Sequence, residues 1–319
     1  MNPMQTSPPT SPVISVTAPV TQAIARVKLL LFQPFDAGKW FVIGFCAWLA
    51  QLGETSFNAG YNFGSFDGRS SGASLQREFE QAKDYVLGNL HWIGPLAVAL
   101  VVVGLLLWVL FTWLSSRGRF MFLHCVALNT AEVSAPWHKF ARAGNSLCVF
   151  RLVLGLIGSL LTLPLVALLV VAIFRMVVAG APSWGGIALA GGALLALIAL
   201  GLLCAVIGKL TTDFVVPIMF RRGARCLVAW RELRGLLSDR LGHLILYLLF
   251  QIVMAIVIGC MVLLVVLVTC CLAGCLFALP YLGTVLLLPV LLFERAYSLH
   301  YLAQFGPEYD VFAAPAAPS

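Results

Sequence analysis

The stretch that decides the fold runs from His243 to Phe293 and reads HLILYLLFQIVMAIVIGCMVLLVVLVTCCLAGCLFALPYLGTVLLLPVLLF. It contains no Asp, Glu, Lys or Arg. A bilayer core about 30 Å thick is crossed by roughly 20 helical residues, so this stretch is much too long for one crossing. We therefore expect it to turn near residues 269–274 and to form two spans, over residues 243–267 and 273–293.

The rest of the chain has the same apolar bias. Hydrophobic residues make up 61% of the sequence and charged residues 10%, whereas soluble domains carry about a quarter charged residues. Four further stretches satisfy the length criterion for a span, the first being the shortest: residues 37–54, 92–114, 147–174 and 185–207. We expect Pro95 in the first turn of the second span, where a missing N–H is tolerated. The predicted fold class is an all-α integral membrane protein with about six transmembrane helices and cytoplasmic-side interfacial amphipathic helices.

The distribution of Lys and Arg predicts the orientation. Of the twenty such residues, sixteen fall on one side of the predicted spans. The other side has only Arg69, Arg77, Lys83 and Arg175. Because cytoplasmic loops carry the excess of positive charge, we expect a cytoplasmic (inner) membrane protein with both termini in the cytoplasm. Anionic headgroups on the cytoplasmic side account for this charge, and no soluble nucleic-acid recognition module is visible.

Three segments lie outside the spans. Residues 1–22 and 306–319 have the composition of disordered cytoplasmic tails, on either side of a single polytopic membrane domain over residues 23–305. Residues 55–91 are expected to form an external loop, whose second half has apolar residues at helical spacing. Two interpretations of that helix stay open, a cap over the bundle and a partner-docking helix.

The stretch DFVVPIMFRRGARCLVAW, residues 213–230, joins an apolar run to a cluster of arginines. We expect Pro217 to bend or stop the helix of the fourth span. From Met219 onward, apolar residues recur at helical spacing, with arginines on the opposite side, which is typical of a helix lying in the membrane interface. The predicted contacts with anionic lipid are made by Arg221, Arg222, Arg225 and Arg231.

Asp213 is an acidic residue next to a predicted span. Ionisable groups near a bilayer core are costly unless they are paired. Lys209 stands four residues earlier, at the spacing of a helical ion pair, and Arg151 lies early in the third span, near the same face of the membrane. We predict a structural ion pair at the cytoplasmic face among Asp213, Arg151 and Lys209, and a role in binding substrate or protons is the alternative.

Motifs of membrane enzymes and motors are missing from the sequence. It has no HExxH and no GxxxxGK[ST] motif, and no GxSxG nucleophile that is accompanied by a buried His. Its nine cysteines and five histidines have no spacing typical of a metal site. We therefore expect no catalytic activity and no cofactor or metal.

Three stretches carry a family resemblance. They are LLFQPFDAGKWFVIGFCAWLAQLGE, RGRFMFLHCVALNTAEVSAPWHKFARAGNSLCVFRL and DFVVPIM, which begin at residues 30, 117 and 213. The chain resembles a family of uncharacterised bacterial and archaeal multi-pass membrane proteins. More distantly, it is similar to the membrane domain of some glycerophosphodiester phosphodiesterases. The resemblance implies no site residues, because the uncharacterised family has no assigned reaction. It does not imply phosphodiesterase activity, because the soluble phosphodiesterase domain is not expected in this sequence.

These observations favour a non-catalytic membrane protein that organises the membrane or envelope, or binds a partner. The alternative is a transporter or permease for a small solute or a lipid. The expected partner is the lipid bilayer with its anionic headgroups on the cytoplasmic side. A protein partner and a homo-oligomer both stay open, and nucleic acid is not expected.

Overall fold

A computed structural model describes residues 14–52, 81, 84–85, 87–178, 183–238, 241–269, 274, 276–277 and 279–313. The regular structure in these ranges is helical and contains no strand, which confirms the all-α class. Most of the predicted external loop lies outside the described residues. The outer ends of both predicted tails, residues 1–13 and 314–319, also lie outside them.

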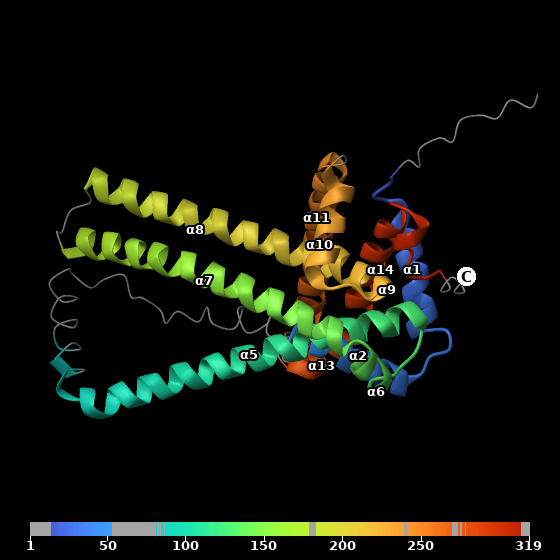
Figure 1. The fold of residues 1–319 in the computed structure, drawn as a ribbon, viewed down its shortest axis with the longest axis horizontal. Helices are drawn as coiled ribbons and strands as arrows, with labels where there is room; N and C mark the ends of the chain where they lie inside the picture. The colour runs from blue at the N-terminus through green and yellow to red at the C-terminus, as the bar shows by residue number, and fades with distance from the viewer. Residues whose placement is uncertain are drawn as a thin grey trace, which may run out of the picture. The chain divides into compact units, whose positions relative to one another are not determined.

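The chain divides into two compact units. Unit 2 comprises Gln51–Arg117 and Gly144–Leu210. It holds most of three long helices, α5 (Leu90–Leu128), α7 (Ala141–Val178) and α8 (Trp184–Leu210), which Figure 1 shows as extended rods.

Four helices among the described residues are long and apolar enough to cross a membrane. They occupy Leu90–Leu128, Ala141–Val178, Trp184–Arg222 and Leu241–Val268, and contain the second to fifth predicted spans. No more than 6% of the apolar window of each is buried within the protein. An apolar helix whose own backbone hydrogen bonds are satisfied is suited to a lipid environment, so the membrane class predicted from composition is supported.

The start of α5 differs from the prediction. Asn89 precedes the helix, and its backbone carbonyl accepts hydrogen bonds from the N–H groups of Trp92 and Ile93. The helix therefore begins at Leu90, and Pro95 lies inside it, beyond the first turn.

Unit 1 comprises Met1–Ala50, Gly118–Ala143 and Thr211–Ser319. Besides the last part of α5, its described helices are α1 (Ala18–Leu31), α2 (Ala37–Gln51), α6 (Ser134–Lys139), α9 (Val216–Arg222), α10 (Cys226–Ser238), α11 (Leu241–Val268), α13 (Pro280–Leu286) and α14 (Leu288–Ala303). A π-helical turn, Thr211–Val215, and a 3₁₀ turn, Pro307–Tyr309, complete the unit. Helix α14 packs along α1, and the two lie side by side in Figure 1.

The first and sixth predicted spans both fall in unit 1. Helix α2 has 15 residues, so it is about 22 Å long and shorter than a bilayer core. In the sixth region, α13 ends at Leu286, and Pro289 lies in the first turn of a new helix that continues to Ala303. Because α14 continues past residue 293 and buries Arg295, the predicted boundary there differs from the structure. Whether either region crosses the membrane stays a prediction.

Pro217 is accommodated by a change of helix type. Helix α8 ends at Leu210, the π turn follows, and Pro217 lies in the first turn of α9. A proline ring clashes with a preceding turn of regular α-helix, and the wider π turn relieves that crowding. The helix ends only at Gly223, whose φ of 63° provides the left-handed cap. The predicted single interfacial helix is therefore two helices, α9 and α10.

Residues 306–313, here called the C-terminal strap, belong to unit 1 and pack against α10 and α14 of the same unit. Tyr309 is buried, and its hydroxyl donates a hydrogen bond of 2.8 Å to Glu232 Oε1. The ring of Phe312 stacks on His300 with 4.4 Å between centroids. The predicted disordered tail from residue 306 onward therefore differs from the structure over the strap.

Candidate functional site

Asp213 occupies the middle of the π turn and is only 5% exposed. The Tyr247 hydroxyl, on α11, donates a hydrogen bond of 2.9 Å to Asp213 Oδ2. The side-chain amide of Gln251, one turn further along α11, donates at 2.9 Å to the Tyr247 oxygen. A polar chain of three side chains therefore connects the π turn to an otherwise apolar helix.

Two arginines bind the residue before Asp213. Arg119, from α5, donates at 2.7 Å to the Thr212 hydroxyl. Arg295, from α14, donates to the Thr212 backbone carbonyl. Their exposed fractions are 5% and 6%. Buried cations are stable only beside groups that compensate their charge, so the π turn, α5 and α14 form one electrostatic cluster.

The charge state of Arg295 follows from its surroundings. Burial lowers the pKa of Arg295 to about 10, while the nearby Asp213 carboxylate raises it and Arg119 lowers it. The guanidinium therefore stays protonated at neutral pH. The Nη2 atom of Arg295 has no hydrogen-bond partner among the described residues. The positive charge of Arg295 is compensated by the nearby negative charge of the Asp213 carboxylate.

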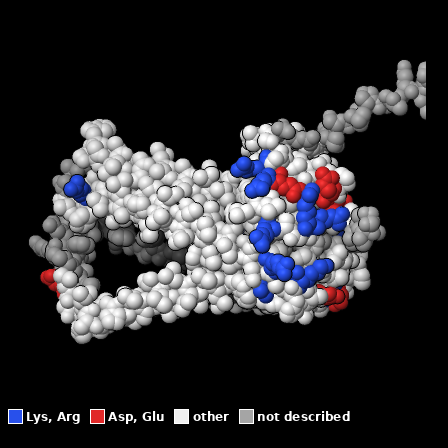
Figure 2. Space-filling view, in the orientation of Figure 1, with Lys and Arg blue, Asp and Glu red and all other residues white. Residues whose placement is uncertain are grey.

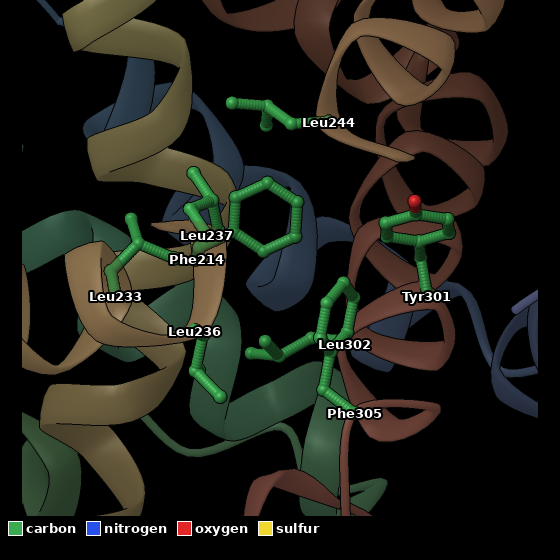
Figure 3. A pocket seen from close by; sticks show the side chains of 8 residues that line it. All are labelled: Phe214, Leu233, Leu236, Leu237, Leu244, Tyr301, Leu302 and Phe305. Atoms are coloured by element: carbon green, nitrogen blue, oxygen red, sulfur yellow. The ribbon is translucent and has the colours of Figure 1, made fainter. Parts of the chain in front are cut away.

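Aromatic and aliphatic side chains surround this cluster. The Tyr247 ring lies 4.9 Å from the ring of Phe214 and 4.6 Å from that of Tyr301, between centroids. A cavity of about 10 Å³ adjoins them, and Figure 3 shows its lining: Phe214, Leu233, Leu236, Leu237, Leu244, Tyr301, Leu302 and Phe305. This volume holds one water molecule at most, and the lining is apolar except for the Tyr301 hydroxyl. The cavity beside Phe214 is therefore small and almost entirely apolar.

The structure places the predicted partners of Asp213 in unit 2. Arg151 donates to the hydroxyls of Ser115 and Ser116, at 3.0 and 3.5 Å. Lys209 lies in the last turn of α8, and the π turn that follows changes the register on which the i, i+4 argument rested. The pairing of Asp213 with Arg151 or Lys209 stays a prediction.

Two of the four predicted lipid-contact arginines also bind groups within unit 1. Arg222 Nη2 lies 2.8 Å from Glu232 Oε1, with its guanidinium 5.5 Å from the Tyr309 ring centroid. Arg221 donates at 3.2 Å to the carbonyl of Ala313, at the end of the strap. Lipid binding by these residues stays a prediction.

The other two arginines lie on α10 or directly before it. Arg225 and Arg231 are exposed, whereas Cys226, Ala229 and Leu233 are buried. The exposed residues of α10 include Leu227 and Val228 as well as Arg231, and an amphipathic helix in the membrane interface stays a prediction.

Sequence reasoning missed Tyr247, Arg119 and Arg295 as members of the cluster. Both arginines were counted only as positive charges that orient the chain, and Tyr247 was part of an apolar run. The available signal was the spacing of Tyr247 and Gln251, two hydrogen-bonding side chains four residues apart on one face of an apolar helix.

A family model described as "Family of unknown function (DUF7544)" matches residues 14–288 of the chain. The chain belongs to this family. Membership in DUF7544 agrees with the predicted resemblance to an uncharacterised family, and no link to glycerophosphodiester phosphodiesterases is found. No curated protein and no solved structure matches the chain. The DUF7544 match includes Asp213 and Tyr247 and ends before Arg295.

Proposed function

We propose that this DUF7544 member is a non-catalytic multi-pass protein of the cytoplasmic membrane that organises the membrane or binds a protein partner. It crosses the bilayer about six times and keeps both termini and its basic surface in the cytoplasm. The observation that carries the proposal is the separation of charged from apolar surface. Figure 2 shows Lys and Arg gathered over the part of the chain that forms unit 1.

The separation is clear in the individual units. The described basic residues of unit 2 are Arg117, Arg151, Arg175 and Lys209. In unit 1, the region of α10 by itself carries three exposed arginines. They are Arg225, directly before the helix, and Arg231 and Arg234, within it. A basic surface carried by the same chain as apolar spans suits a membrane face with anionic headgroups, which guanidinium groups bind through several N–H donors.

The Asp213 cluster supports a structural role over a chemical one. It connects α5, the π turn, α11 and α14 through charge and hydrogen bonds, and the rings of Phe214 and Tyr301 pack against Tyr247. Such a cluster holds several helices in one arrangement, which a scaffold requires.

The second candidate function is transport of a small solute or a lipid. It is favoured by one observation, the chain from Asp213 through Tyr247 to Gln251, which extends along an apolar helix. If the protein is a transporter, Asp213→Asn must abolish uptake of the small solute or lipid by vesicles that contain the folded full-length protein. If Asp213→Asn reduces only the yield of folded protein, the structural role is supported.

The topology is tested by cysteine labelling in intact cells. Asp84→Cys and Arg231→Cys are treated separately with a membrane-impermeant maleimide, and the wild-type chain measures the background from its native cysteines. We expect Asp84→Cys to be labelled in intact cells and Arg231→Cys only after permeabilisation. The opposite pattern would overturn the proposed orientation.

A further inference from the structure

An apolar groove of about 470 Å³ lies along α2 in unit 1. Its lining residues are Phe41, Val42, Phe45, Trp48, Val133 and Tyr281. The Tyr281 hydroxyl donates a hydrogen bond of 3.0 Å to the backbone carbonyl of Phe41. Because this polar group is already satisfied, the groove offers an almost pure hydrocarbon surface, and a polar ligand would lose its hydration there without compensation.

The lining residues of the groove on α2 extend from Phe41 to Trp48, and their aromatic rings gather around Tyr281. The rings of Phe41, Phe45 and Trp48 lie 6.3, 6.4 and 6.2 Å from the ring of Tyr281, between centroids. These positions extend over two turns of α2, about 10 Å. The dimensions suit a linear hydrocarbon chain lying parallel to the helix.

A positive charge stands at one end of the groove. Lys39 precedes Val42 by three residues and so lies on the same face of α2, one turn nearer its N-terminus. Its Nζ donates a hydrogen bond of 2.6 Å to Asn129 Oδ1, which holds the ammonium group in place and leaves two further N–H donors. Beside it, Trp40 Nε1 donates at 2.9 Å to the carbonyl of Val285, anchoring the start of α2 on α13.

We propose that this groove binds an acyl chain of an anionic phospholipid from the cytoplasmic leaflet, with Lys39 contacting the phosphate. The proposal rests on the orientation given under the proposed function, which places the start of α2 at the cytoplasmic surface. Helix α2 then enters the bilayer from the cytoplasmic surface, and its aromatic groove, which begins two residues after Lys39, lies at the depth of the inner-leaflet acyl chains. A cation at the surface end and hydrocarbon below it match the two parts of one phospholipid.

The first experiment maps where a lipid contacts the full-length protein. Phosphatidylcholine vesicles containing the protein receive a trace of phosphatidylglycerol with a photoactivatable diazirine in its acyl chain, and labelled peptides are identified by mass spectrometry. We expect label on α2 and α13 that unlabelled phosphatidylglycerol competes away. Label on the lipid-exposed face of α7, around Leu156, is expected to resist competition, because boundary lipids exchange freely.

Two variants test the two parts of the site. Val42→Trp fills the groove and is expected to reduce labelling of α2 by about tenfold, which corresponds to about 1.4 kcal/mol. Val153→Trp is the matched control, since this valine is exposed on α7. Lys39→Gln is expected to abolish the preference for phosphatidylglycerol, while a phosphatidylcholine probe with the same diazirine labels α2 as before.

Three outcomes would overturn the inference. The first is labelling of α2 that competition does not reduce, and the second is labelling that Val42→Trp leaves unchanged. The third is absence of lipid label on α2 of the wild-type chain, which means that protein covers the groove. Because competition is measured on the wild-type protein, the test holds even if Val42→Trp fails to fold. The maleimide labelling of Arg231→Cys reports the orientation separately, so a wrong topology and an empty groove are distinguished.

Discussion

Tyr247 is the residue through which α11 holds the π turn. Its hydroxyl donates to Asp213 and accepts from Gln251, and its side chain is fully buried. We expect Tyr247→Phe to destabilise the protein by about 1–3 kcal/mol, because the buried Asp213 carboxylate loses a hydroxyl donor and the half-buried Gln251 amide loses its acceptor. Chemical unfolding of the full-length protein in detergent measures the effect.

Tyr301→Phe is the matched control for Tyr247→Phe. The Tyr301 ring belongs to the same aromatic cluster, but its hydroxyl donates only to the backbone carbonyl of His243. The loss of one neutral hydrogen bond costs about 0.5–1.5 kcal/mol. Equal effects of the two substitutions would contradict a special role for the Tyr247 hydroxyl.

Asp213 and Arg295 are expected to be coupled. Removing one member of a buried charge pair leaves the charge of the other uncompensated, which lowers the free energy of unfolding by about 3–5 kcal/mol. We therefore expect Asp213→Asn and Arg295→Gln to be strongly destabilising singly, and their combination to cost less than the sum. A double-mutant cycle on unfolding free energies measures the coupling, and additive effects would rule it out.

The same cycle with Arg151→Gln tests the ion pair predicted from sequence. A double variant of Asp213→Asn and Arg151→Gln that is less destabilised than the sum of the singles would support that pair. Strictly additive effects of the two substitutions would show that Asp213 and Arg151 are not coupled.

At the scale of elements, the contact between α2 and α5 depends on Gly118. A Cβ atom at this position would lie 2.6 Å from the backbone N of Ala50 and 2.6 Å from the backbone C of Leu49. Because both are backbone atoms, no side chain can move aside, and the two helices must separate. We expect Gly118→Ala to destabilise the protein by about 1–3 kcal/mol.

Gly104 provides the control on the same helix, because a Cβ there meets nothing within 4 Å. We expect Gly104→Ala to be neutral or to stabilise by up to about 1 kcal/mol, through the higher helix propensity of alanine. Thermal unfolding of both variants in the same detergent makes the comparison. A Gly118→Ala variant as stable as Gly104→Ala would contradict the close approach of α2 and α5.

At the scale of the whole molecule, the exposed arginines of unit 1 are expected to retain anionic lipid. Native mass spectrometry of the purified protein counts bound phosphatidylglycerol. We expect Arg225→Gln combined with Arg231→Gln to reduce the retained lipid and its sensitivity to salt, since exposed charge interactions are screened. Arg175→Gln, on the side predicted to face outward, is the control, and an equal loss there would contradict the proposed basic surface.

The sequence predicted the class of protein and the position of four helices that can cross a membrane. These properties depend on composition and on local runs of apolar residues, which can be summed along the chain without knowing any contact. The interfacial amphipathic helix that helical spacing indicates around α10 stays a prediction. The sequence did not predict that Pro217 follows a π turn, because the change of helix type depends on the packing around Thr211–Val215.

The tertiary structure alone decided which groups the buried charges meet. Arg295 reads in the sequence as one more positive charge beside a span, yet α14 buries it next to Asp213, a residue 82 positions away. The strap likewise has the composition of a tail, yet Tyr309 is buried and bonded to Glu232. Hydropathy is a property of each residue, whereas the partner of a buried polar group is set by packing between distant segments. The membrane class could therefore be predicted from the sequence, and the Asp213 cluster could not.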